Sequence, residues 1–389
     1  MEILRTLLFF GCLVSTTIIS TAIISTTKAL AHVDTNENLS VVFLNPGFED
    51  RTHSSGEFWV TVSDVMKATA DDLGINLAVE YANRDHLLME RQAQAVLNAK
   101  KLPDFLILVN EKLAGESIIK MAEEKGVKSL LMLNGFQGNQ KVLTGKPRER
   151  YSHWLGTVLP DNHWAGWLQA ESLVETARSQ RLMDADGKIH MLALSGDYVT
   201  QASVDRVKGL LDYVSANPDV VLEQIYVGLW RFDRAKGIME AALDRYPETR
   251  VVWAANDPMA LGALEAINEK NHKKKRGAKS AAFLVGGVNW DSAALKALRE
   301  NQLSIAVGGH IFLGAWSLVL LYDYAHGQDP FVESEDFELI FPVFSALNNH
   351  KLTTQAALLE SRAWETIDFR PYSKVLNPTL KQYQFEADF

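Results

Sequence analysis

The sequence predicts an α/β fold made of two Rossmann-like lobes, each with a parallel sheet. Short apolar segments alternate with amphipathic segments of helical length over most of the chain, which is typical of βαβ units. After a strand and helix at 151–179, a new α/β series starts at residue 188. The length of 389 residues also suits two domains, at roughly 100–200 residues each.

The first series begins with a strand at 39–44, a polar loop at 45–57 and a helix from Phe58. Further strands are expected at 76–81, 105–109, 129–133 and 151–158, with helices at 85–99, 115–125 and 162–179. Gly126 directly follows the helix that ends at Lys125, where glycine is a preferred stop. Residues 135–150 are polar and lack periodicity, so we expect a surface loop there.

The second series has expected strands at 188–195, 220–228, 251–255, 281–287 and 304–308. Helices are expected at 203–216, 233–246, 258–270, 292–300 and 312–325, and the tail adds a strand at 337–341 and an amphipathic segment at 353–366. The basic run at 272–276 favours a solvated loop over a contact with anionic lipid or a partner, because the chain as a whole is acidic.

The stretch 251–264 indicates where a ligand can bind. Residues 251–255 form an apolar run without alternation, as expected for a strand covered on both faces. Asn256 and Asp257 stand at its end, and Pro258 suits the first helical position, so Asp257 is a candidate N-cap. Ligands of open α/β sheets bind beyond such strand ends. A capped turn without a ligand is the alternative interpretation.

Residues 1–31 have the pattern of a cleavable secretory signal peptide. Arg5 supplies a positive charge, residues 7–24 are apolar or hydroxylated, and residues 29–31 form a small-x-small cleavage site. An uncleaved anchor helix is the alternative, which the Thr and Ser residues and the cleavage site disfavour. The single cysteine, Cys12, lies in this segment, so the predicted mature chain has no disulfide. An exported chain without disulfides fits a bacterial periplasm.

Composition and motifs argue against several other classes of protein. The net charge of −9 disfavours a nucleic-acid partner, and no apolar run of about 18 residues follows the signal peptide. The sequence has no His-Glu-x-x-His, Gly-x-Ser-x-Gly or Gly-x-x-x-x-Gly-Lys-Ser/Thr motif. His153 and His163 show no metal-ligand spacing. We therefore expect neither an enzyme nor a cofactor or metal site.

Polar and aromatic side chains recur where the predicted strands end. Amides and a guanidinium can form the paired hydrogen bonds that vicinal hydroxyls of a sugar require, and flat rings can cover its C–H faces. Core packing is the alternative for the rings, and a surface ion pair is the alternative for the guanidinium. The expected ligand-binding residues are Phe58, Trp59, Asn134, Arg206, Trp230, Phe232, Asn256, Asp257, Asn289, Trp290 and His310.

Four motifs resemble the type I periplasmic sugar-binding proteins, the group of the ribose-binding protein and the autoinducer-2 receptor of vibrios. They are ANDPMALGA at 255–263, DRVKG at 205–209, FDRAKG at 232–237 and VGGVN at 285–289. The resemblance covers about residues 39–341 and implies two lobes that are joined by three crossings and close over a ligand. The lobes would be residues 38–158 with 310–335, and residues 159–309 with 336–389.

The resemblance also implies roles for single residues. Phe58 and Trp59 match a ring-stacking pair of the first lobe, and Asn134 matches a polar contact of that lobe. Arg206 matches an arginine that grips ligand hydroxyls. Phe232 matches an aromatic residue of the second lobe.

The match is incomplete at other positions. Asn256, with Asp257 beside it, matches the polar contact at a strand end. Asn289 falls where sugar binders usually have an aspartate, and His310 is next to the position of a glutamine. The missing acidic pair argues against a ribose- or galactose-like hydrogen-bond pattern, and the single arginine disfavours a borate-ester anion. The extra Trp230 and Trp290 favour a larger or flatter ligand.

The sequence thus predicts a monomeric periplasmic solute-binding protein. It would capture a sugar or sugar-like ligand by hinge closure and present it to the membrane permease of an ABC transporter. One alternative is the ligand-binding subunit of a signalling receptor, with a histidine kinase or a diguanylate cyclase as the membrane sensor protein. A second alternative is an exported α/β enzyme that uses Asp257 or Asp197 as a base.

Overall fold

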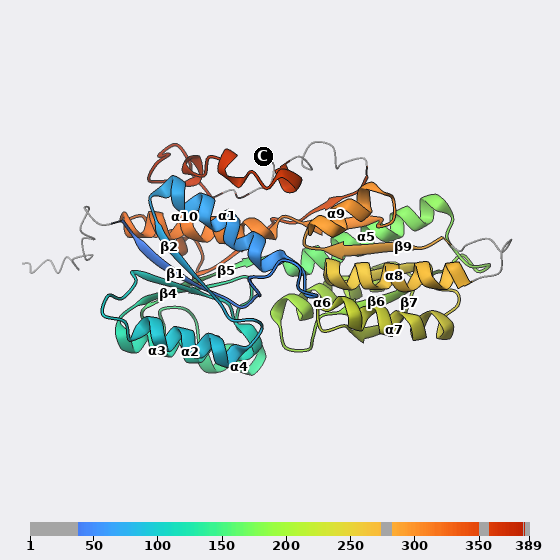
Figure 1. Cartoon of the computed structure of the whole chain (residues 1–389), viewed down its shortest axis with the longest axis horizontal. Coiled ribbons are helices and arrows are strands. Elements are labelled where there is room, and N and C mark those ends of the chain that lie inside the picture. Colours follow the sequence, from blue (N-terminus) through green and yellow to red (C-terminus); the bar gives the residue numbers. More distant parts are fainter. Residues whose placement is uncertain (1–37, 274–281, 350–357, 384, 386–389) are drawn as a thin grey trace, which may run out of the picture. The chain divides into compact units, whose positions relative to one another are not determined.

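The computed structural model describes residues 38–273, 282–349, 358–383 and 385. The expected signal peptide, most of the basic run and the start of the amphipathic tail segment lie outside these residues. Within them, the strands form two six-stranded sheets flanked by helices, which confirms the predicted α/β fold of two lobes (Figure 1).

The first sheet has the strand order β11-β5-β4-β3-β1-β2, and all its neighbours are parallel. Its helices α1 and α10 pack on one face, and α2 and α3 pack on the other (Figure 1). The strands are β1 (Ser40–Asn45), β2 (Asn76–Tyr81), β3 (Phe105–Leu108), β4 (Lys128–Met132), β5 (Trp154–Pro160) and β11 (Glu338–Phe341). The helices are α1 (Phe58–Leu73), α2 (His86–Leu97), α3 (Gly115–Lys125), α4 (Gly138–Thr144) and α10 (Leu313–Ala325).

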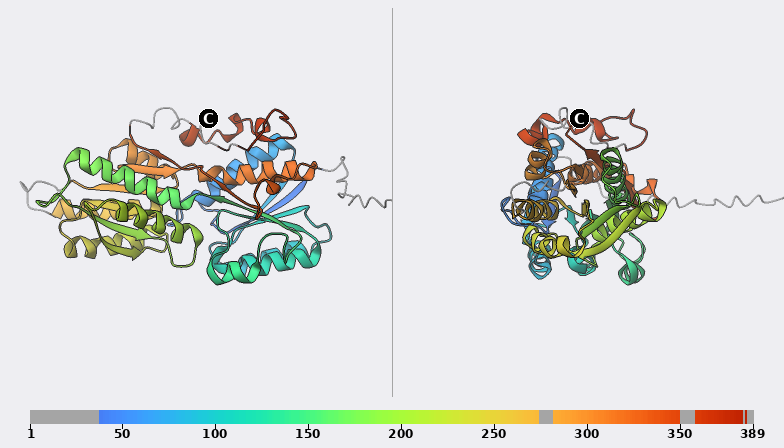
Figure 2. Two further views of the ribbon diagram at one scale, coloured as in Figure 1. Left: turned by 180° about the vertical axis from the view of Figure 1, so that it is seen from behind. Right: turned by 90° about the vertical axis from the view of Figure 1, so that its right-hand side faces the viewer.

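The second sheet has the order β12-β10-β9-β8-β6-β7, and only β12 runs antiparallel to its neighbour among the described strands. Helices α5 and α6 cover one face, and α7 and α8 cover the other (Figures 1 and 2). The strands are β6 (Ile189–Ser195), β7 (Val220–Val227), β8 (Val251–Ala254), β9 (Leu284–Val288), β10 (Ile305–Gly308) and β12 (Ser345–Leu347). The helices are α5 (Asn162–Gln180), α6 (Gln201–Ala216), α7 (Phe232–Arg245), α8 (Asp257–Lys273) and α9 (Ser292–Arg299).

Local sequence signals explain where these elements begin and end. The four residues of β3, Phe-Leu-Ile-Leu, are all buried, as expected for a central parallel strand. Gly74 and Gly126 adopt left-handed φ values of 64° and 68° and end α1 and α3. Asp85 and Asp161 cap α2 and α5 by accepting hydrogen bonds from backbone N–H groups of the first turn. None of the described helices is long and apolar enough to cross a membrane.

The chain passes between the two sheets at three places. It leaves β5 for α5 near Asp161, leaves β10 for α10 through the short 3-10 turn η2 (His310–Phe312), and leaves β11 for β12 at residues 342–344. These are the three crossings that the resemblance implies. The other 3-10 turns are η1 (Glu111–Leu113), η3 (Pro330–Glu333), η4 (Trp364–Thr366) and η5 (Arg370–Tyr372).

The structure corrects two expectations about individual segments. Residues 135–150 are not only a loop, because they contain the short helix α4. The assignment of residues 336–389 to the second lobe is wrong for β11, which pairs with β5 in the first sheet. It is also wrong for the end of the tail, where the rings of Phe369, Tyr372 and Phe385 pack on Trp316 of α10. Helix α10 is apolar on nearly all sides, so its outer face needs this cover.

Candidate functional site

A pocket lies where the carboxyl ends of the strands from both lobes meet. Its atom-free space is about 610 Å³, a value that includes open solvent at the mouth. Eight of the expected ligand-binding residues line it together: Phe58, Trp59, Asn134, Arg206, Trp230, Asn256, Asn289 and His310. The first lobe supplies Phe58, Trp59 and Asn134, and the second supplies most of the others. A ligand here would therefore touch both lobes.

Arg206 on α6 is the buried cation of the pocket, with 3% of its surface exposed. Its Nε donates to Asn162 Oδ1 at 3.0 Å and its Nη1 donates to the carbonyl of Ala255 at 2.6 Å. Its Nη2 donates to His310 Nε2 at 3.2 Å. Burial lowers the pKa of Arg206 to about 9, against the pull of the Asp257 carboxylate, so the guanidinium is charged at pH 7.

His310 is a neutral, stacked side chain that lines the pocket. Its ring lies 4.6 Å from that of Phe58 and 4.7 Å from that of Phe344. Burial and the adjacent Arg206 hold the pKa of His310 well below its ordinary value. Because Nε2 accepts a hydrogen bond from Arg206, the neutral ring carries its proton on Nδ1. In the described structure this buried Nδ1 has no hydrogen-bond partner.

A carboxylate fixes the ring of Trp230, and a glycine leaves room for it. Its Nε1 donates to Asp197 Oδ2 at 2.8 Å, and its ring covers Gly196, where a Cβ atom would lie 2.0 Å from the indole. Burial would raise the pKa of Asp197, but hydrogen bonds from Thr200 and Trp230 outweigh it and the pKa lies below its ordinary value. Asp197 is thus an ionised anchor for the ring.

The amide side chains fix the backbone around the pocket. Asn256 Oδ1 accepts from the N–H of Met259 at 3.0 Å, and its Nδ2 donates to the carbonyl of Trp230 at 3.1 Å. Asn256 therefore caps α8, and the expectation that Asp257 is the N-cap is wrong. Asn134 Oδ1 accepts from the N–H of Ala202 at 3.0 Å, which joins the first lobe to the start of α6.

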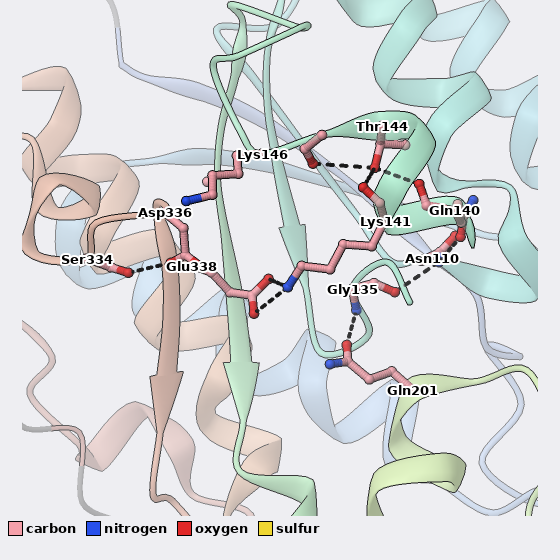
Figure 3. Close-up of polar contacts among 12 residues, drawn as sticks. Asn110, Gly135, Gln140, Lys141, Thr144, Lys146, Gln201, Ser334, Asp336 and Glu338 are labelled. Carbon is pink, nitrogen blue, oxygen red and sulfur yellow. Dashed lines mark hydrogen bonds and ion pairs between the residues drawn. The ribbon is translucent and has the colours of Figure 1, made fainter. Parts of the chain in front are cut away.

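Further hydrogen bonds cross between the lobes. Next to Asn134, the N–H of Gly135 donates to Gln201 Oε1 at 2.6 Å, and Figure 3 shows Gln201 reaching this glycine from α6. A second contact between the lobes lies at a separate cavity, which Glu57 and Ser292 both line. There the N–H of Ser292 donates to Glu57 Oε1 at 2.6 Å, and Arg362 of the tail bonds both side chains. Hydrogen bonds therefore join the described lobes in addition to the three crossings of the chain.

Three expected residues do not line the pocket. Phe232 lines a separate surface cavity, together with Pro258 and other residues. The indole of Trp290 is buried against Gly308 and donates to the carbonyl of Ala306 at 3.1 Å. Asp257 is fully buried and its Oδ2 accepts from the N–H of Asp291, while burial raises its pKa to about 7.

The buried Trp290 gives no support to a larger or flatter ligand, which the sequence favoured on the strength of two tryptophan rings. Of that pair, only Trp230 faces the pocket.

Several lining residues were absent from the expected set: Ser55, Arg84, Leu133, Pro160, Asn162, Thr200 and Ala202. Arg84 follows β2, and Asn162 and Thr200 stand at the starts of helices that follow β5 and β6. The rule that ligands bind beyond the carboxyl ends of strands applies to each of these positions and could have found them. The described residues contain no group of three or more His, Cys, Asp or Glu side chains placed to hold a metal ion.

Comparison of this sequence and structure with known proteins identifies the family. The chain belongs to the family whose model is described as periplasmic binding protein domain, which matches residues 51–329. A crystal structure of a periplasmic sugar-binding protein from Pseudomonas fluorescens has 33% identity and a TM-score of 0.76, covering 89% of this chain and 98% of that one.

Curated relatives agree with this membership. The ribose import binding protein of Escherichia coli (strain K12) is 27% identical over 254 residues, which is 64% of this chain and 74% of that protein. The ribose import binding protein of Bacillus subtilis (strain 168) is 40% identical over 100 residues, which is 25% of this chain and 30% of the relative.

Proposed function

We propose that this chain is a periplasmic binding protein for a sugar or sugar-like ligand. The observation that carries the proposal is the pocket between the lobes, where aromatic rings, amides and a buried arginine converge. Rings cover the C–H faces of a sugar, and fork-shaped polar groups bond its vicinal oxygens. The names of the relatives, which include ribose and sugar binders, support the same class of ligand.

Binding would work by hinge closure. Phe58, Trp59 and Asn134 belong to the first lobe and Arg206 and Trp230 to the second, so a ligand can contact all of them only when the lobes meet. A ligand that binds the closed state more tightly shifts the population toward it. The three crossings allow this motion without breaking either sheet. The closed protein would then present the ligand to the membrane permease of an ABC transporter.

A thermal-shift screen against a sugar library tests the proposal, because a ligand bound only by the folded protein raises its melting temperature. The sugar that gives the largest shift is then titrated by calorimetry into wild type, Trp59→Ala and Trp164→Ala. Trp164 is the matched control, since it is 38% exposed on α5 and does not line the pocket.

We expect Trp59→Ala to weaken binding about 30-fold, the effect of losing an anchor ring worth ~2 kcal/mol, and Trp164→Ala to bind like wild type. A library in which no sugar raises the melting temperature would contradict the proposal, as would equal affinity of wild type and Trp59→Ala. The transport role has its own test. Uptake of the same sugar should be lost in cells without this protein and restored by wild type, and unchanged uptake would exclude that role.

A further inference from the structure

The charges of the pocket do not balance. Arg206 is buried, and none of the described carboxylates lies within 4.0 Å of its nitrogen atoms, because its three hydrogen bonds go to Asn162, Ala255 and His310. The other lining arginine, Arg84, is neutralised at 3.3 Å by Glu111. No Asp or Glu is among the described residues that line the pocket. Asp257 acts on this charge without pairing with it directly, and that carboxyl is itself buried with a raised pKa. The guanidinium is therefore only partly compensated, which is costly in a buried site.

The hydrogen-bonding groups of the pocket are also unbalanced, because more amide and guanidinium donors than amide acceptors remain free. Among the described residues, Asn289 donates to Asp291 and keeps its Oδ1 free, but three other asparagines do not. The Oδ1 atoms of Asn134, Asn162 and Asn256 already accept from Ala202, Arg206 and Met259. In the described structure, the Nδ2 groups of Asn134 and Asn162 form no hydrogen bond with the protein.

Arg206 adds to this excess of donors. A guanidinium carries five N–H donors, and three of those of Arg206 are used. The buried Nδ1–H of His310 also lacks an acceptor.

This excess of donors would interact differently with a neutral sugar and with a sugar that carries a carboxylate. Each hydroxyl of a neutral sugar brings a donor that must find an acceptor, and a buried donor without one costs about 1–3 kcal/mol. An ionised carboxylate accepts hydrogen bonds and donates none, and it forms charge-assisted bonds with guanidinium groups. A carboxylate therefore satisfies both the free donors and the unpaired charge.

We propose that the ligand of this pocket is a sugar acid, whose carboxylate binds between Arg206 and the amide donors of Asn134 and Asn162. This inference rests on the proposed sugar-binding function and specifies its ligand class. A single guanidinium that lacks a direct ion pair matches a singly charged carboxylate better than a doubly charged phosphate. Neutral hydroxyls at the other end of the ligand would face the mouth of the pocket, where water can complete their hydrogen bonds.

Matched pairs of sugars test the proposal directly. Calorimetry compares D-galacturonate with D-galactose and D-glucuronate with D-glucose, and D-galactose 6-phosphate serves as the phosphate arm. We expect at least one acid to bind more than tenfold more tightly than its neutral partner and than the sugar phosphate. If neutral sugars bind as tightly as their acids, this inference fails while the sugar-binding function stands. If the phosphate binds most tightly, the carboxylate assignment fails. If no sugar of any kind binds, the proposed function fails as well.

The variant Asn134→Asp gives a second test from the protein side. One carboxylate oxygen can still accept from Ala202, so the link to α6 is kept, while the free Nδ2 donor becomes an anionic acceptor. We expect the variant to bind the preferred acid at least tenfold more weakly, and to reduce the preference of acid over neutral sugar by at least the same factor. Asn268→Asp makes the same charge change at an exposed position of α8 and should bind like wild type. Unchanged acid affinity in folded Asn134→Asp, monitored by circular dichroism, would overturn the proposal.

Discussion

Replacing Gly166 of α5 by alanine should push α6 away from α5 and displace Arg206. The two helices cross so closely here that a Cβ atom on Gly166 would lie 1.9 Å from the carbonyl oxygen of Arg206. Cβ atoms in protein structures essentially never lie closer than 3.0 Å to another heavy atom. The distance between the two helices must therefore grow by at least 3.0 − 1.9 = 1.1 Å. Neither atom is the end of a flexible side chain. The helices themselves must therefore move.

The expected cost follows from this geometry. Forcing extra atoms into a well-packed core typically costs 1–3 kcal/mol, and we expect Gly166→Ala to lower the free energy of unfolding by about that amount. The same displacement stretches the 3.0 Å hydrogen bond from Arg206 Nε to Asn162, so ligand affinity should fall as well. The close approach of the helices thus positions the buried cation of the pocket.

Urea unfolding followed by tryptophan fluorescence measures this effect, and Gly237→Ala is its matched control. Gly237 lies inside α7, where a Cβ atom would meet nothing within 4 Å. Alanine should stabilise the helix there by ~0.5–1 kcal/mol, since glycine is a poor helix former. The two variants therefore shift the midpoint in opposite directions. A Gly166→Ala variant as stable as wild type would refute the packing argument.

Two further predictions concern pH. His190 bonds Asp184 at 2.9 Å and Glu223 at 2.6 Å, and although burial lowers its pKa, these carboxylates raise it above the ordinary value. His190→Gln should therefore cost ~1–2 kcal/mol at pH 5.5, and less as pH rises through the raised pKa; a cost independent of pH between 5.5 and 9 in urea titrations would contradict this. For Asp257, burial raises the pKa to about 7, so the native state holds an extra proton below pH 7 and loses stability as pH rises. Asp257→Asn should gain more stability over wild type at pH 8 than at pH 5, and an equal gain at both would argue against a buried, neutral carboxyl.

Much of the fold follows from local patterns in the sequence. The apolar run at 251–255 and its polar end became β8 and the start of α8, because a doubly covered strand and a helix cap are encoded by neighbouring residues. The tail was harder to predict. The apolar character of α10 shows that something must cover it, but which segment does so depends on packing between distant parts of the chain.

The sequence predicted only part of the site, because the direction of a side chain also depends on packing between distant residues. Position at a strand end identified most of the lining residues, but it does not give the direction of a side chain. Trp290 adopts a φ of 68°, and its ring is buried against Gly308 instead of facing the pocket. Arg84 follows the end of β2, so the strand-end rule applies to it, but that rule does not show that its side chain turns into the pocket.

A crystal structure of the protein grown with the sugar or sugar acid that binds most tightly in calorimetry tests the central claim most directly. The account predicts electron density for the ligand beside Trp59 and Trp230, with an oxygen atom within hydrogen-bond distance of Arg206. Density at another surface, with this pocket empty although the same ligand binds in solution, would contradict it.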